Sequence, residues 1–244
     1  MKLKLGLIAP PNNSVNQAEW ERMAPEGVSL AIARMKLHAD TDSDAGKKAL
    51  YADLTIAMAE LARHSPDVIA YGCTAGSMVL PLDTVPAFIR RVSGVPGVAT
   101  SPALVHACRA LKLSSISLAT PYHDALNEHE REFFAANGIE VVKLKGLGIG
   151  AGGPQEYVNI ARVAKQQVYE HCLSTDAPAA QGMIISCTDF AAMEAIPRLE
   201  AELGKPVVSS NLATFWMALR SAGFDEALKG WGSLLSVQSI PRAD

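Results

Sequence analysis

Two cysteines in similar surroundings are the residues of this sequence best suited to chemistry. Cys73 lies in the stretch YGCTAGS (71–77), and Cys187 lies in the stretch ISCTD (185–189). Each stretch follows a short apolar run typical of a buried strand and precedes a segment rich in alanine and methionine that favours a helix. A thiol at such a turn is close to unpaired backbone N–H groups and to the positive end of a helix, which stabilise a thiolate and a bound anion. We therefore expect both cysteines to be catalytic.

Two thiols that face one substrate carbon can catalyse two kinds of reaction without a cofactor. In the first, one thiolate takes a proton from one face while the other thiol returns a proton to the opposite face, which inverts a stereocentre. In the second, a thiolate adds to an activated double bond, the new single bond rotates, and elimination gives the other geometric isomer. Both reactions need a thiolate near neutral pH, so we expect the helix terminus to lower one thiol pKa by about one or two pH units. The remaining cysteines, Cys108 and Cys172, lie in helical patterns with apolar neighbours and are expected only to pack.

Polar loops next to the expected strand ends could bind the substrate. The loop PPNNS (10–14) contains Pro11, Asn13 and Ser14, and its side chains and free N–H groups suit a carboxylate without adding a positive charge. The same residue types also suit an ordinary helix N-cap. Further candidates for contact with the same ligand, each also suited to a local structural role, are Thr74, Tyr122 and Thr188.

Strand-like runs alternate with helical patterns along the whole chain. Strands are expected at residues 4–9, 28–35, 68–71, 95–99, 116–119, 139–144, 183–186 and 207–209. Helices are expected at residues 15–23, 45–63, 103–111, 125–137, 157–173, 193–203 and 212–222. This alternation predicts an α/β fold with parallel sheets covered by helices.

The second half of the chain repeats landmarks of the first half in the same order. Residues 6–10 (GLIAP) match residues 117–121 (SLATP), and residues 94–101 match residues 204–211. In each half, one of the two catalytic candidates lies between the first landmark and the second. We therefore expect two pseudo-symmetric, Rossmann-like lobes with the site in the cleft between them, because ligands of α/β folds bind at the carboxyl ends of strands. The predicted lobes are residues 1–103 and 104–214, with residues 215–244 packing back on the first lobe.

Composition excludes several classes of function. The chain has 244 residues, a net charge of -3 and no basic run, so nucleic acid is not an expected partner. No apolar run approaches the roughly 18 residues of a membrane span, and we expect a cytoplasmic protein. Four cysteines without a metal-ligand spacing predict free thiols and no zinc site. The acidic stretch 38–44 lacks the glycine and distal glutamate of a calcium loop, and residues 148–154 lack the pattern of a phosphate-binding loop.

The motifs resemble those of the Asp/Glu racemase superfamily, in the branch that contains maleate cis-trans isomerases, arylmalonate decarboxylases and EutA-type proteins. Residues 10–13 with Glu19 are similar to the start of maleate isomerases, which implies that Asn13 binds a substrate carboxylate. The turn at residues 120–122 resembles a family turn whose tyrosine contacts the substrate. The resemblance also implies that Asn159 is a further substrate asparagine, and that the protein is a homo-oligomer without a cofactor.

In this branch the resemblance places Cys73 and Cys187 at the two catalytic positions, with the first as nucleophile and the second handling the proton. Arylmalonate decarboxylases carry glycine at the first position, so Cys73 argues against simple decarboxylation, although the surroundings of Cys187 are similar to theirs. The Gly-Cys-Thr form of residues 72–74 is closer to EutA-type proteins and amino-acid racemases. We expect a cofactor-independent isomerase of a small carboxylate or dicarboxylate. Maleate-type cis-trans isomerisation is favoured, and the alternatives are racemisation, decarboxylation and a carboxylate-binding protein without activity.

Overall fold

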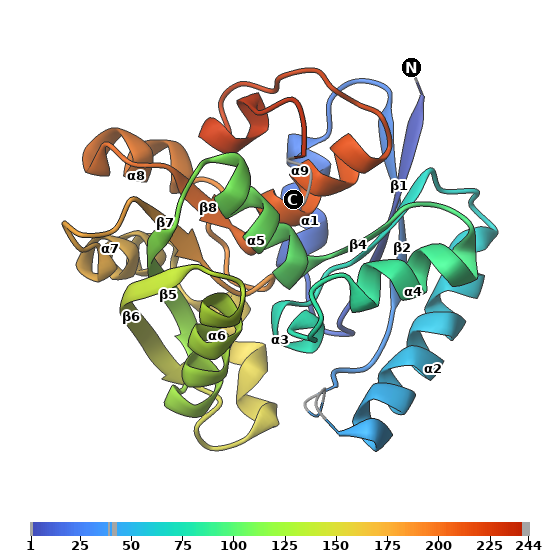
Figure 1. The fold of residues 1–244 in the computed structure, drawn as a ribbon, viewed down its shortest axis with the longest axis horizontal. Coiled ribbons are helices and arrows are strands. Elements are labelled where there is room, and N and C mark those ends of the chain that lie inside the picture. Colours follow the sequence, from blue (N-terminus) through green and yellow to red (C-terminus); the bar gives the residue numbers. More distant parts are fainter. Residues whose placement is uncertain (1, 39, 41–42, 241–244) are drawn as a thin grey trace.

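The fold consists of two four-stranded parallel sheets with helices on their faces (Figure 1). The computed structural model describes residues 2–38, 40 and 43–240. The first sheet has the order β2-β1-β3-β4 and the second has the order β6-β5-β7-β8, so the two sheets share one topology. The strands are β1 (Leu3–Ala9), β2 (Val28–Arg34), β3 (Val68–Tyr71), β4 (Gly97–Ala99), β5 (Ser115–Tyr122), β6 (Glu140–Ile149), β7 (Gly182–Ile185) and β8 (Val207–Ser209). The predicted α/β class and its parallel pairing are confirmed.

The helices connect successive strands and cover the sheets. They are α1 (Val15–Met23), α2 (Asp44–Ala62), α3 (Thr74–Ser77), α4 (Thr84–Ser93), α5 (Thr100–Ala110), α6 (Asp124–Ala136), α7 (Lys165–Thr175), α8 (Ile196–Leu203) and α9 (Ser210–Ser221), with 3-10 helices η1 (Pro154–Arg162) and η2 (Ser233–Ser236). Helices α5 and α9 lie against each other at the centre of the molecule, between the two sheets (Figure 1). In the part of the chain that the structure describes, no helix is long and apolar enough to cross a membrane.

Two matched glycines explain why the sequence landmarks repeat. Helix α4 ends at Gly94 with φ of 79°, and helix α8 ends at Gly204 with φ of 64°. A left-handed residue at this position is favourable for glycine because it has no side chain to clash. In each half a proline and then a short strand follow, β4 in one case and β8 in the other, and α5 or α9 begins directly after it. The repeat is therefore a shared way of ending a helix and returning the chain to its sheet.

Several expected elements differ from the observed ones. The helix predicted at 157–173 is divided into η1 and α7, because Val163 and Ala164 have extended backbones. Strand β6 continues to Ile149, and strand β4 begins only at Gly97. After Cys187 the chain forms turns up to Ala195, and the helix expected at 193–203 begins three residues later than expected, as α8 at Ile196.

Helix α9, near the end of the chain, packs against elements of both halves. Helix α9 contacts α1, β3 and β4 from the first sheet as well as β8 from the second. Its residues Phe215 and Trp216 are fully buried, and Phe215 packs edge-to-face on Trp20 of α1 with ring centroids 5.3 Å apart. The division of the chain at 103/104 stays a prediction. Residues 39, 41 and 42 of the acidic stretch lie outside the described part, as do residues 241–244.

Candidate active site

Cys73 lies where the central strand of the first sheet ends. The four residues of β3 are all buried, and Cys73 is the N-cap of the single-turn helix α3. Its Sγ accepts a hydrogen bond from the Gly76 N–H at 3.4 Å. A side chain at Gly76 would place its Cβ 2.3 Å from the Tyr71 hydroxyl and 3.1 Å from the Cys73 Sγ. Glycine at this position therefore leaves room for the Tyr71 hydroxyl beside the thiol.

Cys187 lies at the matching end of β7, but its backbone differs. Its φ of 88° falls in the left-handed region that residues with side chains rarely adopt. Its Sγ accepts a hydrogen bond from the Asp189 N–H at 3.4 Å, within a turn rather than at the start of a helix. Strained backbone of this kind persists where the surroundings hold it, and it is concentrated at functional sites.

Burial opposes ionisation of both thiols. Burial raises the pKa of Cys73, while hydrogen bonds from the Gly76 N–H and the Tyr71 hydroxyl lower it. Burial also raises the pKa of Cys187 to about 12, against the lowering effect of the Tyr122 hydroxyl and the Asp189 N–H, and the Asp189 charge raises it further. The expected lowering of a thiol pKa is therefore wrong for the ligand-free site. The single turn after Cys73 and the turns after Cys187 supply too few N–H groups to offset desolvation.

Asn13 and Thr188 connect the loops that carry the candidate residues. Asn13 is 4% exposed, and its Nδ2 donates to Thr188 Oγ1 at 2.8 Å. The Thr188 hydroxyl donates to the carbonyl oxygen of Gly72 at 3.2 Å. Arg34, at the end of β2, donates hydrogen bonds to the carbonyl oxygens of Asn13 and Pro10 and so fixes the first loop to the end of that strand.

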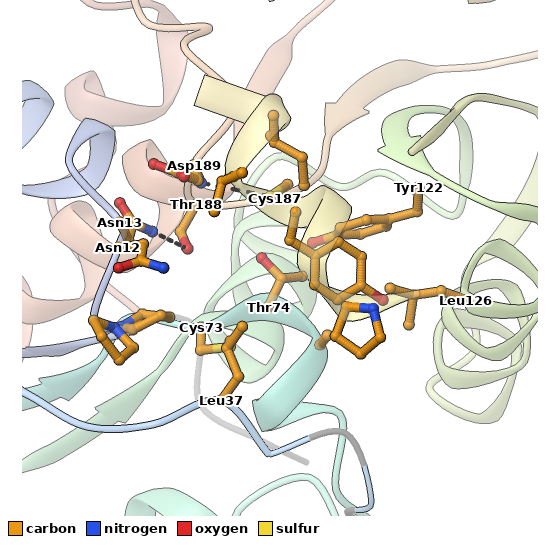
Figure 2. A pocket seen from close by; sticks show the side chains of 17 residues that line it. Asn12, Asn13, Leu37, Cys73, Thr74, Tyr122, Leu126, Cys187, Thr188 and Asp189 are labelled. Atoms are coloured by element: carbon orange, nitrogen blue, oxygen red, sulfur yellow. Dashed lines mark hydrogen bonds between the residues drawn. The ribbon is translucent and has the colours of Figure 1, made fainter. Parts of the chain in front are cut away.

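A pocket brings most of the predicted residues together (Figure 2). The residues that line it from the predicted set are Pro11, Asn13, Cys73, Thr74, Tyr122, Cys187 and Thr188. Figure 2 shows Asn13 and Thr188 on one side, Tyr122 and Leu126 on the other, and the two cysteines between them. Two predicted residues are not in this lining. The backbone N–H of Ser14 donates to Asp189, and Asn159 is exposed on η1 with its Oδ1 facing Arg162.

Sequence reasoning missed Asp189 and one wall of the pocket. The wall is apolar and is formed by Leu37, Leu126, Pro154, Tyr157, Val158 and Ile160. Four of its members, Pro154, Tyr157, Val158 and Ile160, belong to η1, which also contains Asn159, so the sequence located the segment but not the side chains that line the pocket. Asp189 belongs to the second cysteine stretch, and an acidic residue is unusual beside a site that is expected to bind an anion. Of the residues that the structure describes, no lysine or arginine lines the pocket.

Two buried carboxyl groups outside the pocket lining form hydrogen bonds with the segments on either side of Cys187. Glu19 of α1 accepts hydrogen bonds from the Met193 N–H at 3.0 Å and from Asn211 Nδ2 at 2.7 Å, which joins α1 to the segment after Cys187 and to α9. Glu130 of α6 accepts from the Ser186 hydroxyl at 2.6 Å, one residue before Cys187. Burial raises the pKa of Glu130 to about 7.

Known proteins are similar to this chain in sequence. The model of the arylmalonate decarboxylase family matches residues 5–235. An arylmalonate decarboxylase from Bordetella bronchiseptica is 34% identical over 149 residues, which is 60% of this chain and 60% of that protein. A maleate isomerase from Nocardia farcinica is 26% identical, and the match covers 98% of each chain.

Solved structures of the same two kinds have the same fold. A maleate isomerase from Pseudomonas putida S16, solved with maleate, has a TM-score of 0.87 at 23% identity and covers 99% of this chain and all of its own. An arylmalonate decarboxylase has a TM-score of 0.81 at 27% identity, over 96% of this chain and 99% of its own. A variant of the Nocardia farcinica isomerase, with a covalently bound succinylcysteine intermediate, has a TM-score of 0.84 at 23% identity, covering 97% and 99%.

Proposed function

Because the chain belongs to the arylmalonate decarboxylase family, we propose that it is a cofactor-independent isomerase that uses Cys73 and Cys187 on a small carboxylate, with maleate-type cis-trans isomerisation as its reaction. The observation that carries this proposal is the presence of both thiols in one pocket, at the carboxyl ends of equivalent central strands. Relatives matched over nearly their full length are named maleate isomerases, which supports the choice of reaction.

In the proposed reaction Cys73 is the nucleophile. Its thiolate forms a bond to one carbon of the double bond, and the displaced electron pair takes a proton from Cys187 at the other carbon. The two substrate carbons are then joined by a single bond, which rotates. Cys187 takes a proton back, the double bond reforms in the trans geometry, and the Cys73 thiolate leaves. The succinylcysteine in the Nocardia farcinica structure is the type of intermediate that this sequence of steps requires.

The surroundings of the two thiols support this division of roles. Cys73 accepts hydrogen bonds from the Gly76 N–H and the Tyr71 hydroxyl, which favour its thiolate. Burial raises the pKa of Cys187, and the Asp189 charge raises it further against hydrogen bonds from the Tyr122 hydroxyl and the Asp189 N–H, so this thiol keeps its proton and can donate it. Asn13 and Thr188 are proposed to bind the substrate carboxylate, with Thr74 beside them. Burial and Cys187 hold the pKa of Tyr122 well above its usual value, so its hydroxyl keeps its proton and serves as a hydrogen-bond donor.

Decarboxylation of an arylmalonate is the second candidate, favoured by the family model and by the apolar wall of the pocket. A decarboxylation needs one thiol to protonate the carbanion that remains after loss of carbon dioxide. It gives no task to Cys73, whose thiol is buried in the same pocket at 5% exposure. The isomerase is therefore the preferred proposal.

Proton NMR of maleate incubated with the protein tests the proposal. A fumarate signal that grows with time is expected at about pH 6. The rate of its growth should fall by more than about a thousandfold with Cys73→Ser, because a hydroxyl is a far weaker nucleophile than a thiolate. Cys108→Ser is the matched control, since Cys108 is fully buried in α5 away from the pocket.

Other results would favour the alternatives. Release of carbon dioxide from phenylmalonate without fumarate formation would favour the decarboxylase. Incorporation of solvent deuterium at the alpha carbon of an amino acid would favour a racemase. Tight binding of maleate that Cys73→Ser leaves unchanged, with no turnover of any of these compounds, would favour a binding protein.

A further inference from the structure

Asp189 brings a carboxyl group to the edge of a pocket that is expected to bind carboxylates. It lines the pocket next to Thr188 and two residues after Cys187 (Figure 2). Its Oδ1 accepts hydrogen bonds from the Ser14 N–H at 3.2 Å and the Val15 N–H at 3.3 Å, at the start of α1. No residue in the described part of the chain donates a hydrogen bond to its Oδ2. The N–H groups that would otherwise receive a substrate anion are therefore already occupied by the protein.

The charges around Asp189 do not neutralise it fully. From β2, Arg34 attracts its negative charge, but the Arg34 guanidinium donates its hydrogen bonds to Pro10, Asn13 and Gln17 instead. On its own segment the titratable neighbour is Cys187, whose thiol its charge keeps protonated. From α1 it meets only backbone N–H groups. Burial raises the pKa of Asp189 to about 6, so the group changes its charge in a pH range where the protein can be studied.

We propose that Asp189 determines the substrate class of this site: when ionised it admits carboxylates with a single negative charge, and it admits a second carboxylate only when Oδ2 carries a proton. This inference rests on the proposed function, because it concerns the same pocket. The first carboxylate of the substrate binds at Asn13 and Thr188. The remaining polar group of the substrate then faces Asp189, where an amide or another uncharged group is favoured and an anion is repelled.

Protonation converts Asp189 from a repelling group to a donor. A neutral carboxyl group keeps Oδ1 available to the N–H groups of Ser14 and Val15 and offers the Oδ2 proton to a second carboxylate. The preference for a dianion should therefore increase as the pH falls through the pKa of Asp189. Asparagine at this position would imitate the neutral form permanently, because its Oδ1 still caps α1 while its Nδ2 donates.

Maleate and maleamate provide a matched test, since they have the same shape and differ by one negative charge. Dissociation constants of both are measured by calorimetry in a Cys73→Ser background, which prevents turnover, with Asp189 intact and with Asp189→Asn. Near pH 8, Asp189→Asn should reduce the ratio of the maleate to the maleamate constant by about ten- to a hundredfold, as expected for two charges several ångströms apart in a partly buried site. Near pH 5 maleate is itself largely a monoanion, so the pH dependence is measured with fumarate and fumaramate. Their ratio should become similar in the two proteins near pH 5, because Asp189 is then protonated. Asp83→Asn, which removes an exposed charge at the start of α4, should leave the ratio unchanged.

Each remaining result is decisive. Equal weakening of both ligands by Asp189→Asn, with a lower melting temperature, would mean that Asp189 only caps α1 and would overturn the inference. An unchanged ratio would overturn it as well, whether or not maleate is isomerised by the native protein. A shifted ratio without any isomerisation would support the role of Asp189 and overturn the proposed reaction. If neither compound binds any variant, the pocket is not a carboxylate site and both proposals fail.

Discussion

The side chain of Asn13 donates a hydrogen bond to the Thr188 hydroxyl, although the two residues are 175 positions apart in the chain. That hydroxyl donates in turn to the carbonyl oxygen of Gly72, the residue before Cys73. A single hydroxyl group thus fixes the loop after β1, the turn that carries Cys73 and the turn that carries Cys187.

Thr188→Val should therefore lower the activity strongly, although it removes only one hydroxyl group. Valine keeps the shape but leaves the buried Asn13 amide without its acceptor, which costs about 1–3 kcal/mol. We expect kcat/KM for isomerisation to fall by about ten- to a hundredfold, because small displacements of reacting groups slow a reaction strongly. Thr188→Ser retains the hydroxyl and should remain within about threefold of the native rate. Equal activity of the valine and serine variants would contradict the proposed role of the hydroxyl.

The two candidate thiols should differ in reactivity in the ligand-free protein. Burial raises the pKa of Cys187, Cys108 and Cys172 to about 12 each, and it also raises the pKa of Cys73. Two hydrogen bonds favour the thiolate at Cys73 and at Cys187, but at Cys187 the Asp189 charge opposes it. Iodoacetamide should therefore alkylate Cys73 first. Its rate should increase through pH 9 without levelling off, since the thiolate fraction grows about tenfold per pH unit below the pKa.

Mass spectrometry of peptides that contain each cysteine gives these rates with and without maleate. Protection of Cys73 by maleate would support its place in the ligand site, and Cys108 serves as the internal control. A rate for Cys73 that levels off near pH 7 would instead mean that its pKa is lowered, as the sequence alone suggested.

The sequence predicts the arrangement of elements well where local chemistry decides it. The buried runs before Cys73 and Cys187 identify strands without knowledge of distant contacts. Helix α4, which ends at Gly94, is not among the expected helices. The residues between Cys187 and Ile196 show the limit, because their composition favours a helix but they form turns. Glu19 of α1 accepts a hydrogen bond from the Met193 N–H, and Asn211 of α9 donates one to the Thr188 carbonyl oxygen. Such partners are far away in the chain and carry no local pattern.

The same reason explains the errors at the site. The N–H groups of a strand-to-helix turn predict a lowered pKa for one of the two thiols, but the degree of burial follows from packing of the whole molecule. Asp189 was overlooked because its role depends on the start of α1, which only the fold brings to it. The assembly into oligomers stays a prediction from the resemblance.

Glu130 should make the protein less stable as the pH rises. Its carboxyl group is 1% exposed, Oε1 accepts from the Ser186 hydroxyl, and Oε2 is enclosed with no partner among the described residues. Because burial raises its pKa from 4.5 to about 7, the native state holds this proton over a pH range in which the unfolded chain has released it. The free energy of unfolding must then decrease as the pH increases through that range, by up to about 3 kcal/mol from this group.

Urea denaturation of the native protein and of Glu130→Gln between about pH 5 and 8.5 measures this contribution. Glutamine still accepts the Ser186 hydroxyl and cannot ionise, so the variant should lose less stability with increasing pH than the native protein does. Asp189 and Glu19 also have raised pKa values, so a smaller decrease should remain. Glu128→Gln on the same helix, with a side chain that is 60% exposed, should keep the native dependence. If Glu130→Gln keeps it too, Glu130 is ionised in the folded protein.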